Sequence, residues 1–237
     1  CLLGANGAGK STTISLLTGL IEASAGEVDI YGHSLSNDLA SVRKLTGICP
    51  QQNVILPTLT VREHLEIFAA IKGIHNDGDH DSNGQHQHRL SRARDLAVRT
   101  AVEEVGLTDK LDVPAAALSG GMKRKLCLAI ALIGDPKFVL LDEPTSGMDP
   151  YSRRSTWEML LKHKAGRVVV LTTHFMEEAD SLGDRIVIMS EGTLRCSGSS
   201  LYLKNRYGAG YVLALAREKQ DHDASMHGDE AVDHVHD

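Results

Sequence analysis

Residues Gly4–Ser11 (GANGAGKS), close to the first residue of the chain, form a glycine-rich turn that few folds contain. Glycines let successive backbone N–H groups point at one anion, because no Cβ stands in the way. The pattern fits G-x-x-x-x-G-K-S/T, in which the lysine reaches the outer phosphates of a nucleotide and the hydroxyl holds Mg²⁺. A glycine-rich turn that binds nothing is the alternative. We predict that the turn binds phosphate because an apolar strand, Cys1–Leu3, precedes it and a helix follows it.

Apolar periodicity indicates how the rest of the chain is organised. Phe138–Leu141 and Val168–Leu171 are continuous apolar runs of strand length, typical of parallel strands buried on both faces. Thr60 and Glu63 form a capping box that begins a helix. A short half-buried strand is expected at 27–31, and helical spacing is expected at 9–17, 96–105 and 122–133. Strands that alternate with helices predict an α/β domain with a mostly parallel sheet.

Two polar stretches are not expected to pack. Residues 75–89 (HNDGDHDSNGQHQHR) have no apolar side chain with which to offset their ordering entropy, so we predict a mobile surface insertion. Residues 216–237 are predicted to be a disordered acidic tail. Histidines in both stretches could bind Zn²⁺, but no framework fixes a ligand geometry, and a solvated insertion is the favoured interpretation. The histidines are His75, His80, His86, His88, His222, His227, His234 and His236.

Net charge, the length of the apolar runs and the spacing of the cysteines restrict the class of protein to which this chain can belong. The net charge of -6, from 25 Lys plus Arg against 31 Asp plus Glu, leaves no basic surface for nucleic acid. The longest apolar stretch, Leu126–Gly134, is far shorter than the roughly 18 to 20 residues of a membrane-spanning helix, so this segment is predicted to be soluble. Four widely spaced cysteines predict reduced thiols in a cytosolic compartment.

A pair of carboxylates stands at the end of the apolar run Phe138–Leu141. Asp142 could hold the water shell of Mg²⁺, and Glu143 could polarise a water in line with a γ-phosphate. Two adjacent carboxylates at the end of a buried strand are costly to desolvate without a cation to face. A strand that ends in a solvated acidic turn is the plainer interpretation.

A second anion site follows from Leu118–Lys123 (LSGGMK), where a serine and two glycines begin a helix. One nucleotide does not need two such helix ends far apart in a single domain. Here the sequence resembles the ATP-binding cassette (ABC) family, in which this signature faces the nucleotide of a partner domain, so that two domains enclose two ATP molecules head to tail. The resemblance assigns Ser119, Gly120, Gly121 and Met122 to the partner's nucleotide.

The resemblance extends over nearly residues 1 to 215 and implies further roles. Gln51 resembles the glutamine of the Q-loop, with Gln52 as a competing candidate; Asp149 resembles the D-loop aspartate; and His174 resembles the histidine that contacts the γ-phosphate. Glu143 is then the base, with His174 and Gln51 completing the catalytic set, and Ser11, Asp142 and Gln51 hold Mg²⁺. ATP would be bound by Gly4, Asn6, Gly7, Ala8, Gly9, Lys10, Ser11 and Thr12.

The family's fold is implied too: an α/β P-loop NTPase with a RecA-like parallel sheet core, an inserted α-helical subdomain and an incomplete antiparallel β subdomain. The corresponding boundaries are 1–215 for the nucleotide-binding domain, 1–52 and 135–205 for the catalytic core, and 53–134 for the helical subdomain that contains the signature.

Several stretches, including DEPTSGMDPYSRR and LYLKNRYGAGY, are similar to the A subfamily, membrane proteins that mostly move lipids. This implies ATP hydrolysis that powers transport of lipid, at the cytosolic face of a multi-pass membrane protein. The implied partners are a second nucleotide-binding domain in the same polypeptide and transmembrane domains. The start at Cys1 is then predicted to be a truncation.

Two rival hypotheses stay open at this stage. A soluble ABC ATPase of translation or DNA repair shares the motifs but would show tandem cassettes or a long coiled coil. A cassette that holds ATP as a structural clamp would not hydrolyse it, and the presence of Glu143 and His174 disfavours that hypothesis.

Overall fold

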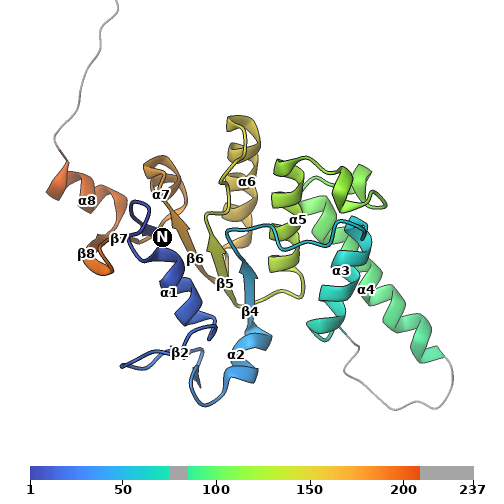
Figure 1. Ribbon diagram of the computed structural model, residues 1–237. Coiled ribbons are helices and arrows are strands. Elements are labelled where there is room, and N and C mark those ends of the chain that lie inside the picture. Colours follow the sequence, from blue (N-terminus) through green and yellow to red (C-terminus); the bar gives the residue numbers. More distant parts are fainter. Residues whose placement is uncertain (75–84, 209–237) are drawn as a thin grey trace, which may run out of the picture.

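The computed structural model describes residues 1–74 and 85–208, except for the side chains of 85–92, and its centre is a six-stranded sheet (Figure 1). The strands lie in the order β4-β5-β6-β1-β7-β8. Only β8 runs antiparallel to its neighbour. The predicted α/β class with a mostly parallel sheet is confirmed. The strand bounds are β1 Leu2–Leu3, β4 Thr46–Cys49, β5 Phe138–Asp142, β6 Val168–Thr173, β7 Ile186–Ser190 and β8 Thr193–Gly198.

Helices cover both faces of the sheet, and alternate side chains of β5 pack against the helices on opposite faces. Phe138 and Leu140 pack against one group of helices, whereas Val139 and Leu141 belong to the core on the other side. Successive side chains of a strand point to opposite faces, and Phe138–Leu141 are buried on both faces, as predicted; Asp142, which ends β5, is buried too. The first group is α1 Lys10–Leu17 and α2 Leu39–Leu45; the second includes α5 Gly120–Leu132, α6 Pro150–His163 and α7 Met176–Leu182.

The prediction that Val168–Leu171 is buried on both faces is wrong for its first half. Val168 is 48% exposed, and Val169 and Val170 are half-buried. The reason lies in the register: β1 pairs with β6 only from Leu2 and Thr172 onward, so in the described part of the chain the start of β6 is paired with β5 alone.

A helical unit lies beside the sheet, next to α5 (Figure 1). It contains α3 Val61–Ile71, α4 Gln85–Glu104 and two short 3₁₀ turns, Thr108–Lys110 and Ala115–Ala117. The predicted capping box is confirmed: the Thr60 hydroxyl accepts a hydrogen bond from the Glu63 amide, and the Glu63 carboxylate accepts one from the Thr60 amide. Leu65, Val98 and Leu126 join these helices in the main core.

Three local expectations differ from the structure. α4 already begins at Gln85, so the predicted insertion is wrong for 85–89, while 75–84 and the tail 216–237 lie outside the described residues. Gln and Arg are good helix formers, and the free-energy cost of extending an existing helix by a few such residues is small. The strand expected at 27–31 is shorter: β2 is Asp29–Ile30, which pairs with β3 His33–Ser34. α8 Ser200–Tyr207 was not predicted.

No helix in residues 1–74 or 85–208 combines the length and apolar character needed to cross a bilayer. The four cysteines are free thiols, and Cys49 and Cys127 are buried. Burial raises the pKa of the Cys49 thiol to about 12, so it is protonated at any physiological pH.

We expect Gly47→Ala to destabilise the protein, because a Cβ on this β4 glycine would lie 1.9 Å from the carbonyl oxygen of Ala131 in α5. Overpacking of this kind costs about 1–3 kcal/mol in the free energy of unfolding, measured by urea denaturation. Gly120→Ala is the matched control, since a Cβ there meets no atom within 4 Å. Equal stability of the two variants would contradict the tight contact between β4 and α5.

Candidate functional site

Four parallel strands end at the same edge of the sheet, and a predicted site residue follows each of them. Gly4 follows β1, Gln51 comes shortly after β4, Glu143 directly follows β5, and His174 directly follows β6. Ligand crevices of open parallel sheets lie at this edge. A cavity of about 250 Å³ is present there, lined by Asn6, Gly7, Gly9, Lys10, Ser11, Thr12, Gln51 and Glu143.

The turn that precedes α1 has the geometry of an anion cradle. Gly7 and Gly9 have φ of 80° and 99°, a left-handed region that glycine enters without strain. No side chain caps the start of α1, so the N–H groups of its first turn are available to a ligand. Gly4 and Ala8, which do not line the cavity, support the turn: a Cβ on Gly4 would lie 2.7 Å from the Met189 carbonyl oxygen, and Ala8 is buried.

Lys10 folds back over the turn and is only 5% exposed. Its Nζ donates hydrogen bonds to the carbonyl oxygens of Gly4 (2.9 Å) and Ala5 (3.1 Å). The same Nζ lies 3.7 Å from Oε1 of Glu143. This ion pair compensates two charges that would be expensive to bury alone.

Glu143 is the residue that the other predicted catalytic side chains contact. Its Oε1 lies 3.2 Å from Nδ1 of His174, and its Oε2 accepts a hydrogen bond of 3.3 Å from Nε2 of Gln51. Of the two candidate glutamines, Gln51 is the one whose side chain contacts the carboxylate. Glu143 has a φ of 49°, and strained backbone of this kind in a non-glycine residue clusters at functional sites.

Asp142 lies behind Glu143 and is held by a residue that the sequence analysis did not assign to the site. Thr172 of β6 donates a short hydrogen bond from Oγ1 to Oδ1 of Asp142, and the Glu143 amide donates to that same Oγ1 at 3.0 Å. Thr172 is fully buried. The signal available in the sequence was the Thr172–Thr173 pair, two polar residues at the end of an apolar strand just before His174.

A second missed residue is Arg124, on the first turns of α5. Its guanidinium is buried and donates to five backbone carbonyl oxygens, those of Pro50, Gln51, Asp142, Glu143 and Pro144. An arginine one turn before Leu128, on the apolar stripe of a helix, was the signal that could have revealed it.

The signature residues lie at the start of α5. Ser119 and Gly120 are exposed, while Gly121 and Met122 are half-buried. Ser119 caps the helix, because its Oγ accepts a hydrogen bond of 3.3 Å from the Met122 amide. None of these four lines the cavity at Lys10, so the structure leaves the signature open to a second molecule and apart from the chain's own phosphate turn.

Asp149 also lies outside the cavity, as the N-cap of α6. Its Oδ1 accepts a hydrogen bond of 2.9 Å from the Ser152 amide. Hydrogen bonds from the side chain and amide of Ser152 hold the pKa of Asp149 below its usual value. The residue is exposed, so the loop before α6 is accessible.

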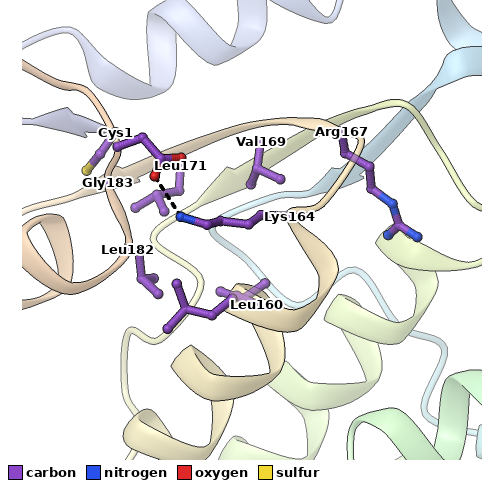
Figure 2. A pocket seen from close by; sticks show the side chains of 10 residues that line it. Cys1, Leu160, Lys164, Arg167, Val169, Leu171, Leu182 and Gly183 are labelled. Atoms are coloured by element: carbon purple, nitrogen blue, oxygen red, sulfur yellow. Dashed lines mark hydrogen bonds and ion pairs between the residues drawn. The ribbon is translucent and has the colours of Figure 1, made fainter.

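Figure 2 shows a different pocket, between α6, β6 and the first residue of the chain. Leu160, Leu171 and Leu182 are among the residues that line it, and Lys164 forms an ion pair of 2.7 Å with Asp184, which also lines it. None of the predicted site residues lines it, whereas every residue that lines the cavity at Lys10 is a predicted site residue, so the cavity at Lys10 is the candidate site.

A family model described as ABC transporter matches residues 1–146, more than half of the 237 residues. The chain belongs to the ABC transporter family. The match includes the phosphate turn, the signature and the carboxylate pair.

The most similar relatives of this ABC transporter family member include A-family proteins. "ABC transporter A family member 6" of Dictyostelium discoideum is 50% identical over 220 residues, which cover 93% of this chain and 13% of the relative. "Phospholipid-transporting ATPase ABCA3" of Homo sapiens is 48% identical over 92% of this chain and 12% of its own length. "Retinal-specific phospholipid-transporting ATPase ABCA4" of Homo sapiens is 45% identical over 97% and 10%, respectively. The chain thus spans about an eighth or less of the length of these relatives.

Solved structures show the same fold. An ATP binding subunit of an ABC transporter superimposes with a TM-score of 0.71 and 29% identity, over 87% of this chain and 80% of that one. A dimeric ATP-binding cassette in a post-hydrolysis state, bound to ADP and Pi, gives a TM-score of 0.71 at 24% identity, over 84% and 83%. This ABC family member therefore has the predicted P-loop NTPase α/β fold.

We expect Thr172→Val to lower the free energy of unfolding by about 1–3 kcal/mol, because the change removes both hydrogen bonds of Oγ1 from buried partners. Thr172→Ser keeps the hydroxyl and serves as the control, with a smaller loss. Guanidinium denaturation measures both. A valine variant as stable as the serine variant would show that the hydroxyl does not hold Asp142 and Glu143.

Proposed function

We propose that this cassette binds MgATP and hydrolyses it. The observation that supports this proposal best is the convergence of Lys10, Gln51 and His174 on the Glu143 carboxylate at the edge of the sheet. A lysine that reaches phosphate, an amide, a carboxylate and an imidazole are the groups that phosphoryl transfer to water requires. The lysine, the amide and the imidazole each lie within 3.7 Å of the Glu143 carboxylate, beside the phosphate turn.

The phosphates would be bound by the turn and by Lys10. The free N–H groups at the start of α1, together with the helix dipole, favour a negatively charged ligand. When the β- and γ-phosphates are present, Lys10 can exchange its two carbonyl partners for phosphate oxygens without a large movement, because its Nζ already lies over the turn.

The residues proposed to hold Mg²⁺ supply oxygen atoms, the ligands that this ion prefers. These are the exposed hydroxyl of Ser11, the carboxylate of Asp142 and the Oε1 of Gln51, whose Nε2 already bonds to Glu143. One carboxylate, a few neutral oxygens and substrate phosphates are a typical Mg²⁺ environment. Bound Mg²⁺ would neutralise charge that develops on the phosphate oxygens.

Glu143 is proposed as the general base. Its carboxylate can accept a proton from a water molecule as that water attacks the γ-phosphorus, and Gln51 and His174 flank the carboxylate where they can orient the water and the transferred phosphate. The burial of Glu143 strengthens these interactions, since the local dielectric constant is low. Hydrolysis is therefore favoured over a purely structural role for bound ATP.

The exposed signature supports a partnership with a second cassette. Ser119 and Gly120 present a helix N-terminus that faces solvent, which suits the nucleotide held by a second cassette in a head-to-tail pair. The parent polypeptide is proposed to couple hydrolysis to transport through transmembrane domains, with this cassette on the cytosolic side. A lipid is the proposed cargo, because two of the relatives are named phospholipid-transporting ATPases.

We expect Glu143→Gln in the complete natural polypeptide to reduce ATP hydrolysis by on the order of a hundredfold or more while ATP still binds, because an amide cannot accept the proton of the attacking water. Phosphate release and retention of radiolabelled ATP are the measurements. Glu158→Gln, an exposed change on α6, is the control. Undiminished phosphate release by the Glu143 variant would remove this residue from the role of base.

We expect Gly121→Asp to reduce hydrolysis with little effect on nucleotide binding at the chain's own phosphate turn. The new carboxylate would repel phosphate at the start of α5, which does not line the Lys10 cavity. Steady-state ATPase rates and photolabelling with an azido-ATP would separate the two effects. Ala116→Asp, an exposed substitution three residues before Ser119, is the control for added charge. Equal rates for both variants would argue against a partner nucleotide at the signature.

A further inference from the structure

We propose that Arg124 is a positioning residue that fixes Gln51 and Glu143 relative to each other and ties both to the helix that starts at the signature. This inference rests on the proposed ATP hydrolysis, since it assigns a role in that reaction to a residue that does not itself line the cavity. Three segments that are far apart in the sequence meet at this one side chain.

The contacts use the whole guanidinium. Nη1 donates to the carbonyl oxygens of Pro50 and, at 3.0 Å, of Gln51, just after β4. Nη2 donates to the carbonyl oxygens of Asp142 and, at 2.9 Å, of Glu143, at the end of β5. Nε donates to the carbonyl oxygen of Pro144 at 3.1 Å. An arginine side chain has five N–H donors, and all five are used.

Only an arginine can make this set of bonds. The guanidinium is planar, and its donors form a rigid fork, whereas a lysine has one nitrogen with three donors and cannot span three directions. Arg124 is 2% exposed, and burial of a charge is costly unless every polar atom is compensated. Here backbone carbonyl oxygens compensate the charge, so the guanidinium holds the backbone of the segments that follow β4 and β5.

The position of Arg124 in α5 adds a connection between two sites. Ser119 caps this helix, and Arg124 follows five residues later, about 7.5 Å along the axis at 1.5 Å per residue. A helix of this length moves as a rigid element, so a displacement of its exposed first turn also displaces the guanidinium. Contact of the signature with a partner's nucleotide would therefore be transmitted to the Gln51–Glu143 pair of this chain, whose side chains are 3.3 Å apart.

The role predicts an effect on turnover and not on substrate binding. Arg124 makes no contact with Lys10 or with the free N–H groups of α1, so the phosphate-binding groups keep their positions when it is replaced. A misplacement of about 1 Å at catalytic groups can cost on the order of a hundredfold in rate.

The test uses Arg124→Lys and Arg124→Gln in the complete natural polypeptide. The expected result is a fall in kcat for ATP of on the order of a hundredfold for both variants, with KM changed by less than about threefold. Arg62→Lys is the matched control: Arg62 lies in α3, in a partly exposed ion pair of 2.8 Å with Asp112, and the same substitution there should leave kcat unchanged.

A double-mutant cycle with Gln51→Ala separates positioning from general damage. If Arg124 acts through Gln51, the double variant should turn over no more slowly than the slower single variant, because the two changes disrupt the same arrangement. Hydrogen exchange should also become faster around residues 50–52 and 142–144 in Arg124→Lys, with protection retained in α3.

The outcomes distinguish this inference from the proposed function. A wild-type protein that does not hydrolyse ATP would overturn the proposed function, whereas an active wild type with an equally active Arg124→Lys would overturn the positioning role alone. Additive losses in the cycle, or a rise in KM as large as the fall in kcat, would also overturn it. Loss of the thermal unfolding transition in both Arg124 variants would assign the residue to stability and reject the positioning role.

Discussion

The pairing of β5 with β6 is the interaction on which the rest of the site depends. Its parallel register places Asp142 beside Thr172, and Glu143 then follows β5 as His174 follows β6. β1 pairs with the other edge of β6, with Leu3 beside Thr173, and this places the phosphate turn at the same end of the sheet. Two ladders of backbone hydrogen bonds, β5 with β6 and β1 with β6, therefore bring the phosphate turn close to Glu143 and His174, which lie more than a hundred residues further along the chain.

Buried charge is balanced locally throughout the site, in two different ways. Lys10 and Glu143 compensate each other across 3.7 Å, and both can change partners when a phosphate arrives. Arg124 instead is compensated by carbonyl oxygens that cannot leave, because they belong to the backbone after β4 and β5. Exchangeable partners suit Lys10, which is proposed to bind phosphate. Fixed backbone partners suit Arg124, which is proposed to hold the segments after β4 and β5 in place. The positive φ of Glu143 is tolerated within that frame, since Thr172 and Arg124 hold the backbone on both sides.

Local sequence patterns predicted most of the elements, and their failures have physical causes. The predicted capping box at Thr60, the helix at 9–17 and the buried strand Phe138–Leu141 depend on neighbours in the sequence, and all three are present. The first half of β6 was predicted to be buried, but among the described residues it pairs only with β5, and periodicity does not reveal which strands are neighbours. The helical start at Gln85 was missed because the stretch is polar, although polarity does not prevent a helix from propagating.

The sequence by itself determined the chemistry that the chain offers: a glycine-rich turn with Lys10, two carboxylates after an apolar strand, a histidine after another, and an exposed helix start at Ser119. Each of these is a short pattern whose meaning depends on adjacent residues. The tertiary structure alone decided that Gln51, and not Gln52, contacts Glu143, that Thr172 holds Asp142, and that Arg124 joins three segments. These contacts depend on strand register and on the direction of buried side chains, which arise from packing between distant segments and have no local signature.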